Sequence, residues 1–442
     1  MLQSSIGRIR ADGAPCERAS SVSWRRATGP VALCMAALSL TACGGDDATT
    51  TTPGEVEGPG EPGEPQGPTM TGPVYALSSS VFTTGGDRTV YFATTSSLDV
   101  PVPSLDDARE YGGVANYAAV SGRLLISSGE EPTITAFDVD DDMTWHERET
   151  LSFASYPLND NANFFSQYLV DDHHMYLPFD GYKRIVWDPT DFAILGVMED
   201  STLQFDRDGM TLEPAGNRSG IRYAGGQVMM PFFYHDEDWF EFGAVSPIAV
   251  YDPVAHTEQK VVEAPCSGLA VASQDEAGYT YFSPYDYMPL LALYGQGPSP
   301  CLARLTPEQE LDAGFTTDLR NLTGGRYTNS FRYIRDGWGL ANVLNEELLG
   351  VDFSAPMTAE VQDAVWDEAN WTVWKIDLVN GTARPFDEIS IPSFGWNIVQ
   401  VDGRSFLALP SEGITTMYEM DQDGNVGQSM TVTGDASWIR VR

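Results

Sequence analysis

One short apolar pattern decides the fold of this chain, because it recurs six times and each copy ends at a turn: ITAFDV (134–139), RIVWDP (184–189), IAVYDP (248–253), ARLTP (303–307), VWKIDL (373–378) and TTMYEM (415–420). A strand hairpin with a polar turn precedes each copy, as in NYAAVSGRLLISS (116–128) and FRYIRDGWGLAN (331–342). Short alternating runs joined by Ser-Gly or Asp-Gly turns indicate antiparallel strands. The chain therefore repeats a unit of three or four strands.

The number of these units predicts the architecture. Residues 74–98 supply a seventh, less regular unit, so seven units occupy residues 74–442. This spacing is typical of an all-β, seven-bladed β-propeller, whose radial closure protects the strand edges of a long all-β chain. We expect the final strand, near Ser437–Val441, to complete the first blade. Eight blades is the alternative count, while a β-sandwich or a parallel β-helix fits the repeat length less well.

The N-terminal region has the pattern of an export signal. Arg25 and Arg26 precede an apolar run over residues 31–40, and small residues lead to Cys43 in Leu-Thr-Ala-Cys. A basic segment, a short apolar segment and a small-residue cleavage site are typical of a secreted chain. Because a Cys directly follows the cut, as in a lipobox, we expect a lipoprotein signal peptide over 1–42 and lipid attachment at Cys43. An ordinary secretory signal is the alternative.

The segment after the signal predicts a spacer. Residues 43–73 consist mainly of Gly, Pro, Thr and Glu, which cannot bury enough apolar surface to fold. We expect a lipidated cysteine and a disordered linker over 43–73, followed by the propeller over 74–442. The predicted location is the cell envelope, lipid-anchored to the membrane with the outer membrane favoured, and the predicted state is a monomer.

Charge and motif content exclude some functions. The chain holds 63 Asp and Glu against 25 Lys and Arg, a net charge of −38. Nucleic acid is excluded as a partner, because its phosphates require neutralisation by basic side chains. Residues 74–442 contain no GxSxG, HExxH or P-loop pattern. The leading prediction is therefore a protein that is not an enzyme and has no cofactor or metal.

Three consecutive units carry long insertions between their second and third strands, over residues 235–246, 286–300 and 343–370. In a four-stranded blade these loops lie on the same face as the crossovers between blades. Loops displayed on a rigid scaffold often carry function. Their aromatic side chains are candidate ligand-binding residues, namely Trp239, Phe240, Tyr287, Tyr294 and Trp366. The alternative is that the loops only pack on one another and cap the scaffold.

Two thiols, Cys266 and Cys301, remain in the predicted exported domain. Exported proteins form disulfides, and both positions fall on the face that carries the insertions, so we expect one bond that pins the loop 286–300. Two free buried thiols are the alternative.

Arg326, Arg332 and Arg335 form a local basic cluster in this acidic chain. The period of two in a strand places Arg326 and Arg332 on one face, where they are candidate ligands for an anion. The alternative is that each arginine pairs with a neighbouring carboxylate.

Histidines and acidic runs give weaker indications of metal binding. His235 is followed by an acidic run, while His173 and His174 are adjacent and are expected to point to opposite faces of a strand. Residues 138–149 match a calcium loop at several acidic positions, but Met143 stands where the loop requires Gly. We expect an acidic hairpin turn there and assign no metal site.

The layout resembles a family of bacterial β-propeller surface lipoproteins associated with siderophore uptake clusters of the myxochelin type. The features that carry the resemblance are the lipobox at Cys43, the acidic spacer, VYALSSSVF (74–82) with TVYFATTSSL (89–98), RIVWDP and IAVYDP. Membership implies a non-enzymatic role in siderophore-mediated iron acquisition, with a ferric siderophore or an outer-membrane receptor as partner. It carries over no ligand-binding residue.

The leading prediction is thus a lipid-anchored binding or accessory protein for iron acquisition. The alternatives are a general cell-surface module that binds protein or polysaccharide, and a metal-dependent propeller hydrolase or lactonase.

Overall fold

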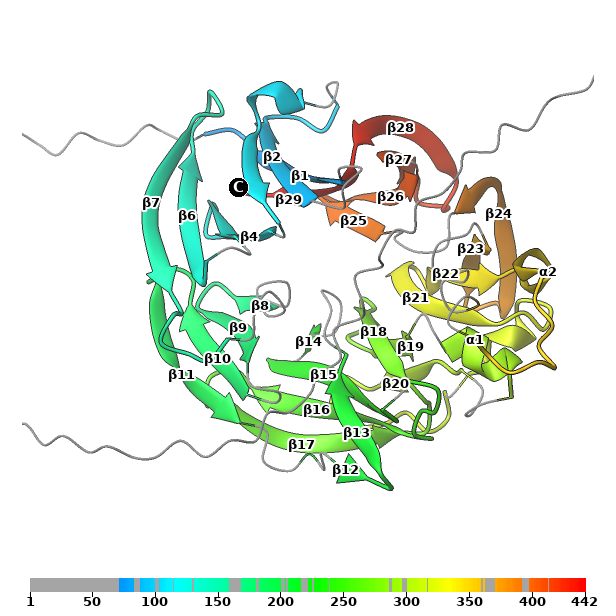
Figure 1. Cartoon of the computed structure of the whole chain (residues 1–442). Helices are drawn as coiled ribbons and strands as arrows, with labels where there is room; N and C mark the ends of the chain where they lie inside the picture. The colour runs from blue at the N-terminus through cyan, green and yellow to red at the C-terminus, as the bar shows by residue number, and fades with distance from the viewer. Residues whose placement is uncertain are drawn as a thin grey trace, which may run out of the picture. The chain divides into compact units, whose positions relative to one another are not determined.

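Figure 1 shows a computed structural model of the chain, which divides into two compact units, Met1–Glu64 and Pro65–Arg442. The structure describes residues 71–82, 88–99, 103–113, 115–128, 131–158, 168–179, 183–199, 203, 206–215, 222–224, 226–237, 239–285, 288–295, 300–315, 317–358, 361, 370–391, 397–411 and 413–442. The signal peptide, Cys43 and most of the linker lie outside these residues, so their predictions are not tested. None of the helices formed by the described residues has the length and apolar character needed to cross a membrane.

The second unit is a ring of seven antiparallel sheets, the blades of a β-propeller (Figure 1). Blade 1 comprises β29 (Asp435–Arg440), β1 (Tyr75–Phe82), β2 (Arg88–Thr95) and β3 (Arg109–Gly112), and blade 2 comprises β4 (Ala115–Val120), β5 (Arg123–Ser128), β6 (Thr133–Val139) and β7 (Trp145–Ser152). Blade 3 comprises β8 (Tyr168–Asp171), β9 (His174–Phe179), β10 (Lys183–Asp188) and β11 (Ala193–Glu199). The predicted seven-bladed all-β architecture is confirmed.

Blade 4 comprises β14 (Arg222–Ala224), β15 (Gln227–His235), β16 (Ser246–Asp252) and β17 (Thr257–Ala264), and the crossover hairpin β12 (Asp206–Arg207) and β13 (Met210–Pro214) extends its sheet along β15. Blade 5 comprises β18 (Leu269–Gln274), β19 (Thr280–Pro284) and β20 (Ala303–Leu305). Blade 6 comprises β21 (Thr328–Arg335), β22 (Trp338–Leu344), β23 (Trp371–Asp377) and β24 (Thr382–Ile391), and blade 7 comprises β25 (Asn397–Val401), β26 (Arg404–Ser411), β27 (Ile414–Met420) and β28 (Val426–Thr433). Short helices are η1 (Leu105–Asp107), α1 (Met288–Leu293), η3 (Leu319–Asn321) and α2 (Glu346–Leu349).

The six copies of the recurring pattern are the third strands of blades 2 to 7, as their spacing predicts. Except for β20, which ends its three-stranded sheet, these strands lie between two others, and five of the six residues of β10 and six of the seven of β16 are buried. The outer strand β11 instead alternates between exposed and less exposed positions. A buried third strand therefore shows as a nearly continuous apolar run, while an outer strand shows as an alternating one.

The ring closes through the last strand. β29 pairs with β1 over six positions, from Tyr75 opposite Arg440 to Ser80 opposite Asp435. The C-terminal strand is thus the innermost strand of the blade that the N-terminal strands begin, which confirms the predicted closure. Trp438 of β29 is 5% exposed and packs in a cluster with Tyr75, Leu77 and Phe406 from blades 1 and 7.

The strand directions sort the loops onto two faces. Loops between second and third strands and crossovers between blades share one face, which we name the insertion face because it carries the described parts of the segments 236–245, 285–302 and 345–370. Turns between first and second strands and between third and fourth strands share the other, which we name the hairpin face. The suggested calcium loop is such a turn between β6 and β7, where the Asp140 carboxylate accepts the Thr144 N–H at 2.8 Å. The expected acidic hairpin is confirmed.

The predicted disulfide joins Cys266 and Cys301, whose Cα atoms are 5.4 Å apart. Cys266 lies in the crossover before β18, is 1% exposed, and packs in a cluster with Leu269 and Phe282. Cys301 lies just before β20. The bond therefore connects both ends of the segment that contains β18, β19 and the insertion with α1.

Replacing both cysteines by alanine should lower the free energy of unfolding by about 3–4 kcal/mol, because the bond closes a loop with a sequence separation of 35 residues. Urea denaturation of the double variant against the oxidised wild type measures this difference. The wild type treated with a reductant is the matched control and should unfold like the variant. Equal midpoints for the oxidised and the reduced wild type would show that the bond does not stabilise the blade.

Candidate functional site

The long loops of the insertion face pack against one another where the structure describes them. The ring centroids of Trp239 from the first loop and Tyr285 from the second are 6.5 Å apart, and those of Tyr294 from the second loop and Phe353 from the third are 5.4 Å apart. Met288, Leu290 and Leu291 of α1 are buried beneath them. The alternative interpretation, that the loops cap the scaffold, describes this part of the face. Tyr287 and Trp366 lie outside the described residues.

A buried histidine stands at the edge of this cap. His235 is the last residue of β15 and is 6% exposed. Its Nδ1 lies 2.6 Å from the carbonyl oxygen of Asp236. Because a carbonyl oxygen only accepts hydrogen bonds, Nδ1 carries a proton, and Nε2 is the nitrogen that can present a lone pair. Among the described residues Nε2 has no hydrogen-bond partner.

A carboxylate faces that free nitrogen. Glu213 Oε2 lies 4.0 Å from His235 Nε2, and the Glu213 side chain is 46% exposed. The register of β13 on β15 places Thr211 opposite His235 and Glu213 opposite Phe233, so the crossover hairpin from blade 3 brings the carboxylate to the histidine. The pair thus joins a buried base to a group in contact with solvent.

The loop after His235 holds the imidazole in place. The Asp236 carboxylate accepts the N–H groups of Phe240 at 2.7 Å and Glu241 at 2.9 Å, which closes a tight loop. Trp239, in this loop, stacks on the His235 ring with centroids 3.9 Å apart and is itself 37% exposed. Trp239 therefore covers one face of the imidazole ring. Nε2, at the edge of the ring, faces Glu213.

This arrangement differs from the metal ligation suggested for His235. Asp236 Oδ1 is used within the loop, and His235 belongs to no group of three or more potential ligands among the described residues. An imidazole whose Nδ1 carries a proton and whose Nε2 lies 4.0 Å from a carboxylate is instead suited to general-base chemistry, because the carboxylate stabilises the imidazolium that forms. The sequence pointed to His235 through its acidic neighbours, but its closest carboxylate comes from another strand.

The arginine cluster is separated by the fold. Arg326 precedes β21, and its guanidinium donates to both carboxylate oxygens of Glu347 in α2, at 2.8 and 3.1 Å. This hydrogen bonding lowers the pKa of Glu347. Arg335 ends β21 and donates to Ser405 Oγ in blade 7 at 2.9 Å. Arg326 therefore agrees with the alternative interpretation, in which an arginine pairs with a neighbouring carboxylate.

The expected shared face of Arg326 and Arg332 is corrected. Arg326 lies before the strand, and β21 shifts register between Asn329 and Arg332, where Ser330 has a positive φ of 50°. An irregularity of this kind interrupts the alternation of side chains that the prediction assumed. Ligand binding by any of the three arginines, or by Trp239, Phe240 and Tyr294, stays a prediction.

One group could hold a metal on the hairpin face. The side chains of His173, Asp188 and Asp191 converge from two turns of blade 3, with one ligand atom of each within 4.8 Å of the others. This is the one group of three or more such residues found in the described part of the chain. His174 bonds a different carboxylate, Asp171, at 2.8 Å, so the adjacent histidines do not share a ligand site.

Comparisons with known proteins place the fold among solved propellers. The structure is similar to the periplasmic gluconolactonase PpgL of Pseudomonas aeruginosa, with a TM-score of 0.50 and 14% identity, over 84% of this chain and 99% of that one. It is also similar to candidate 6-phosphogluconolactonases of Bacteroides uniformis (TM-score 0.46, 10% identity, 84% and 100% covered) and Bacteroides fragilis (TM-score 0.44, 12% identity, 84% and 98% covered). No family model matches the chain. No curated protein matches it either.

The leading functional prediction is corrected by this result. A non-enzymatic binding or accessory protein for siderophore-linked iron acquisition was expected, but the solved structure that the chain matches with a TM-score of 0.50 is a gluconolactonase. The absence of short catalytic motifs does not test for such an activity, because a propeller can assemble a site from separate strands and crossovers. The resemblance to siderophore-associated lipoproteins, the membrane anchor and the monomeric state stay predictions.

Proposed function

We propose that this protein is a lactonase-like hydrolase whose general base is His235. The observation that carries the proposal is the buried His235 Nε2, which has no hydrogen-bond partner among the described residues and has the Glu213 carboxylate 4.0 Å away. The propeller shared with a gluconolactonase supports the choice of a cyclic ester as substrate.

The proposed reaction uses both members of the pair. Water attacks the carbonyl carbon of the lactone while His235 Nε2 takes one of its protons, and Glu213 stabilises the resulting imidazolium. The ring C–O bond then breaks, and the imidazolium returns its proton to the departing ring oxygen. The product is the open-chain hydroxy acid, and the imidazole is again neutral. Trp239 keeps the ring orientation through this cycle, because it covers one face of the imidazole.

The proposal is tested by acid release. The purified protein is mixed with glucono-1,5-lactone, a γ-lactone of a sugar acid and an aliphatic δ-lactone, and proton release is followed with a pH indicator. We expect hydrolysis of at least one sugar lactone above the spontaneous rate, saturating with substrate concentration. Rates equal to buffer alone for all three classes would contradict a lactonase.

A further inference from the structure

The two hairpin-face turns of blade 3 build a compact polar group. Asp188 ends β10 and is 7% exposed. Its Oδ1 accepts the N–H groups of Thr190 at 2.8 Å and Asp191 at 2.9 Å, which fixes the carboxylate within its turn. The other oxygen, Oδ2, lies 3.0 Å from His173 Nδ1. One carboxylate oxygen is therefore used by the turn, and the other faces the histidine of the neighbouring turn.

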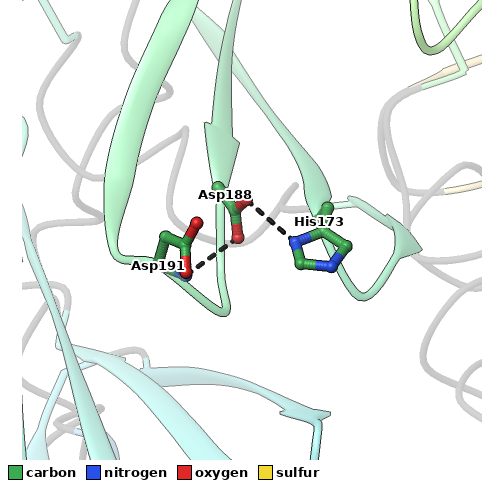
Figure 2. A group of neighbouring side chains, drawn as sticks. All are labelled: His173, Asp188 and Asp191. Carbon is green, nitrogen blue, oxygen red and sulfur yellow. Dashed lines mark hydrogen bonds and ion pairs between the residues drawn. The ribbon is translucent and has the colours of Figure 1, made fainter.

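The third member completes a set of ligand atoms. Figure 2 shows His173, Asp188 and Asp191 directed toward one another, and one ligand atom from each lies within 4.8 Å of the others. The Asp191 backbone is held by Asp188, while its carboxylate forms no hydrogen bond or ion pair with any residue that the structure describes. An imidazole nitrogen and two carboxylates could therefore bind one ion without any change of backbone conformation.

The surroundings hold these turns rigidly and keep them acidic. Asp171 accepts the His173 N–H at 2.8 Å, and Thr190 donates to the carbonyl of Asp172 from the other turn. Arg123 of blade 2 reaches the carbonyl of Thr190 at 3.5 Å but pairs its charge with Asp138 and Glu149. The positive charge of Arg123 is therefore paired with carboxylates of blade 2. The side chains of Asp188 and Asp191 face His173 instead.

We propose that His173, Asp188 and Asp191 bind one divalent transition-metal cation, such as Mn²⁺ or Zn²⁺, on the hairpin face. One imidazole nitrogen with two carboxylate oxygens suits these ions, whereas Ca²⁺ and Mg²⁺ prefer oxygen ligands alone. The remaining coordination positions are open to water. Because the ligands come from two turns, the cation joins the first and second strands of blade 3 to its third and fourth strands.

The site does not depend on the proposed hydrolase function. His235 lies on the insertion face of blade 4, and the metal group lies on the hairpin face of blade 3. Metal binding and lactone hydrolysis can therefore fail or succeed separately.

The test is a titration of the chelator-treated, purified protein with Mn²⁺, in which the electron paramagnetic resonance signal reports the free ion. Asp191→Asn and His173→Gln remove one ligand each without removing the Asp188 contacts that hold the turn. His146→Gln is the matched control, because His146 of β7 also pairs with an aspartate, Asp140 in the β6–β7 turn of blade 2, at 2.8 Å, but belongs to no such group among the described residues.

We expect one saturable Mn²⁺ site per chain in the wild type and in His146→Gln. Asp191→Asn and His173→Gln should each weaken binding by about tenfold or more, because even changes outside the direct ligands cost that much at metal sites. Ca²⁺ should compete poorly with Mn²⁺. No saturable binding, or equal binding by all four proteins, would overturn the proposal and leave only general attraction of cations to an acidic surface.

Discussion

His235→Asn should lower the rate of lactone hydrolysis by about 10²–10⁴-fold, the usual contribution of a positioned general base. Asparagine retains a short N–H donor for the Asp236 carbonyl, which His235 Nδ1 now contacts at 2.6 Å. It removes the imidazole ring, with the Nε2 atom that faces Glu213 and the surface on which Trp239 stacks. The variant therefore removes the base and keeps a donor for the loop carbonyl.

The separation of kcat from KM supplies a readout that a purely structural role would not change. Glu213→Gln should lower kcat and leave KM unchanged, since the imidazolium formed during the reaction then lacks its neighbouring carboxylate. His146→Asn, on the hairpin face, is the control and should hydrolyse lactones at the wild-type rate. Unchanged hydrolysis by His235→Asn would exclude His235 as the base.

Deletion of residues 435–442 should abolish the cooperative unfolding transition. The deletion removes β29, and with it the six-position ladder on β1 and the buried Trp438. Loss of a buried tryptophan side chain alone costs about 3–5 kcal/mol, and a folded domain is stable by only about 5–15 kcal/mol in total. Removal of the whole strand also exposes the edge of β1, so the combined loss exceeds what the domain can tolerate.

Thermal unfolding followed by circular dichroism measures this effect. The full-length variant Ser437→Ala is the control, because Ser437 is a small, only partly buried residue of the same strand, and its transition should stay within about 0.5 kcal/mol of the wild type. A truncated protein that still unfolds cooperatively near the wild-type temperature would show that ring closure by β29 is dispensable.

The candidate site was only partly predictable from the sequence. His235 stood out through its acidic neighbours, yet Asp236 uses its carboxylate to close a loop, and the carboxylate nearest to Nε2 is Glu213 on the crossover hairpin. Similarly, Arg326 was noticed as a cation, but its partner Glu347 lies in an insertion. The group of His173, Asp188 and Asp191 joins two turns that the sequence shows only as separate hairpin ends.

The sequence alone determined the propeller, because strand periodicity, polar turns and a repeated third strand are local properties of about ten residues at a time. Residues such as Ile185, Val186 and Trp187 are apolar in succession because a third strand is covered on both sides. The closing strand and the disulfide also followed, since they depend on the order of the blades rather than on detailed contacts. Only the tertiary structure decided which polar groups contact one another. Those contacts depend on strand register, on irregularities such as the one at Ser330, and on which strand a crossover hairpin pairs with. Each of these is fixed by packing between distant segments.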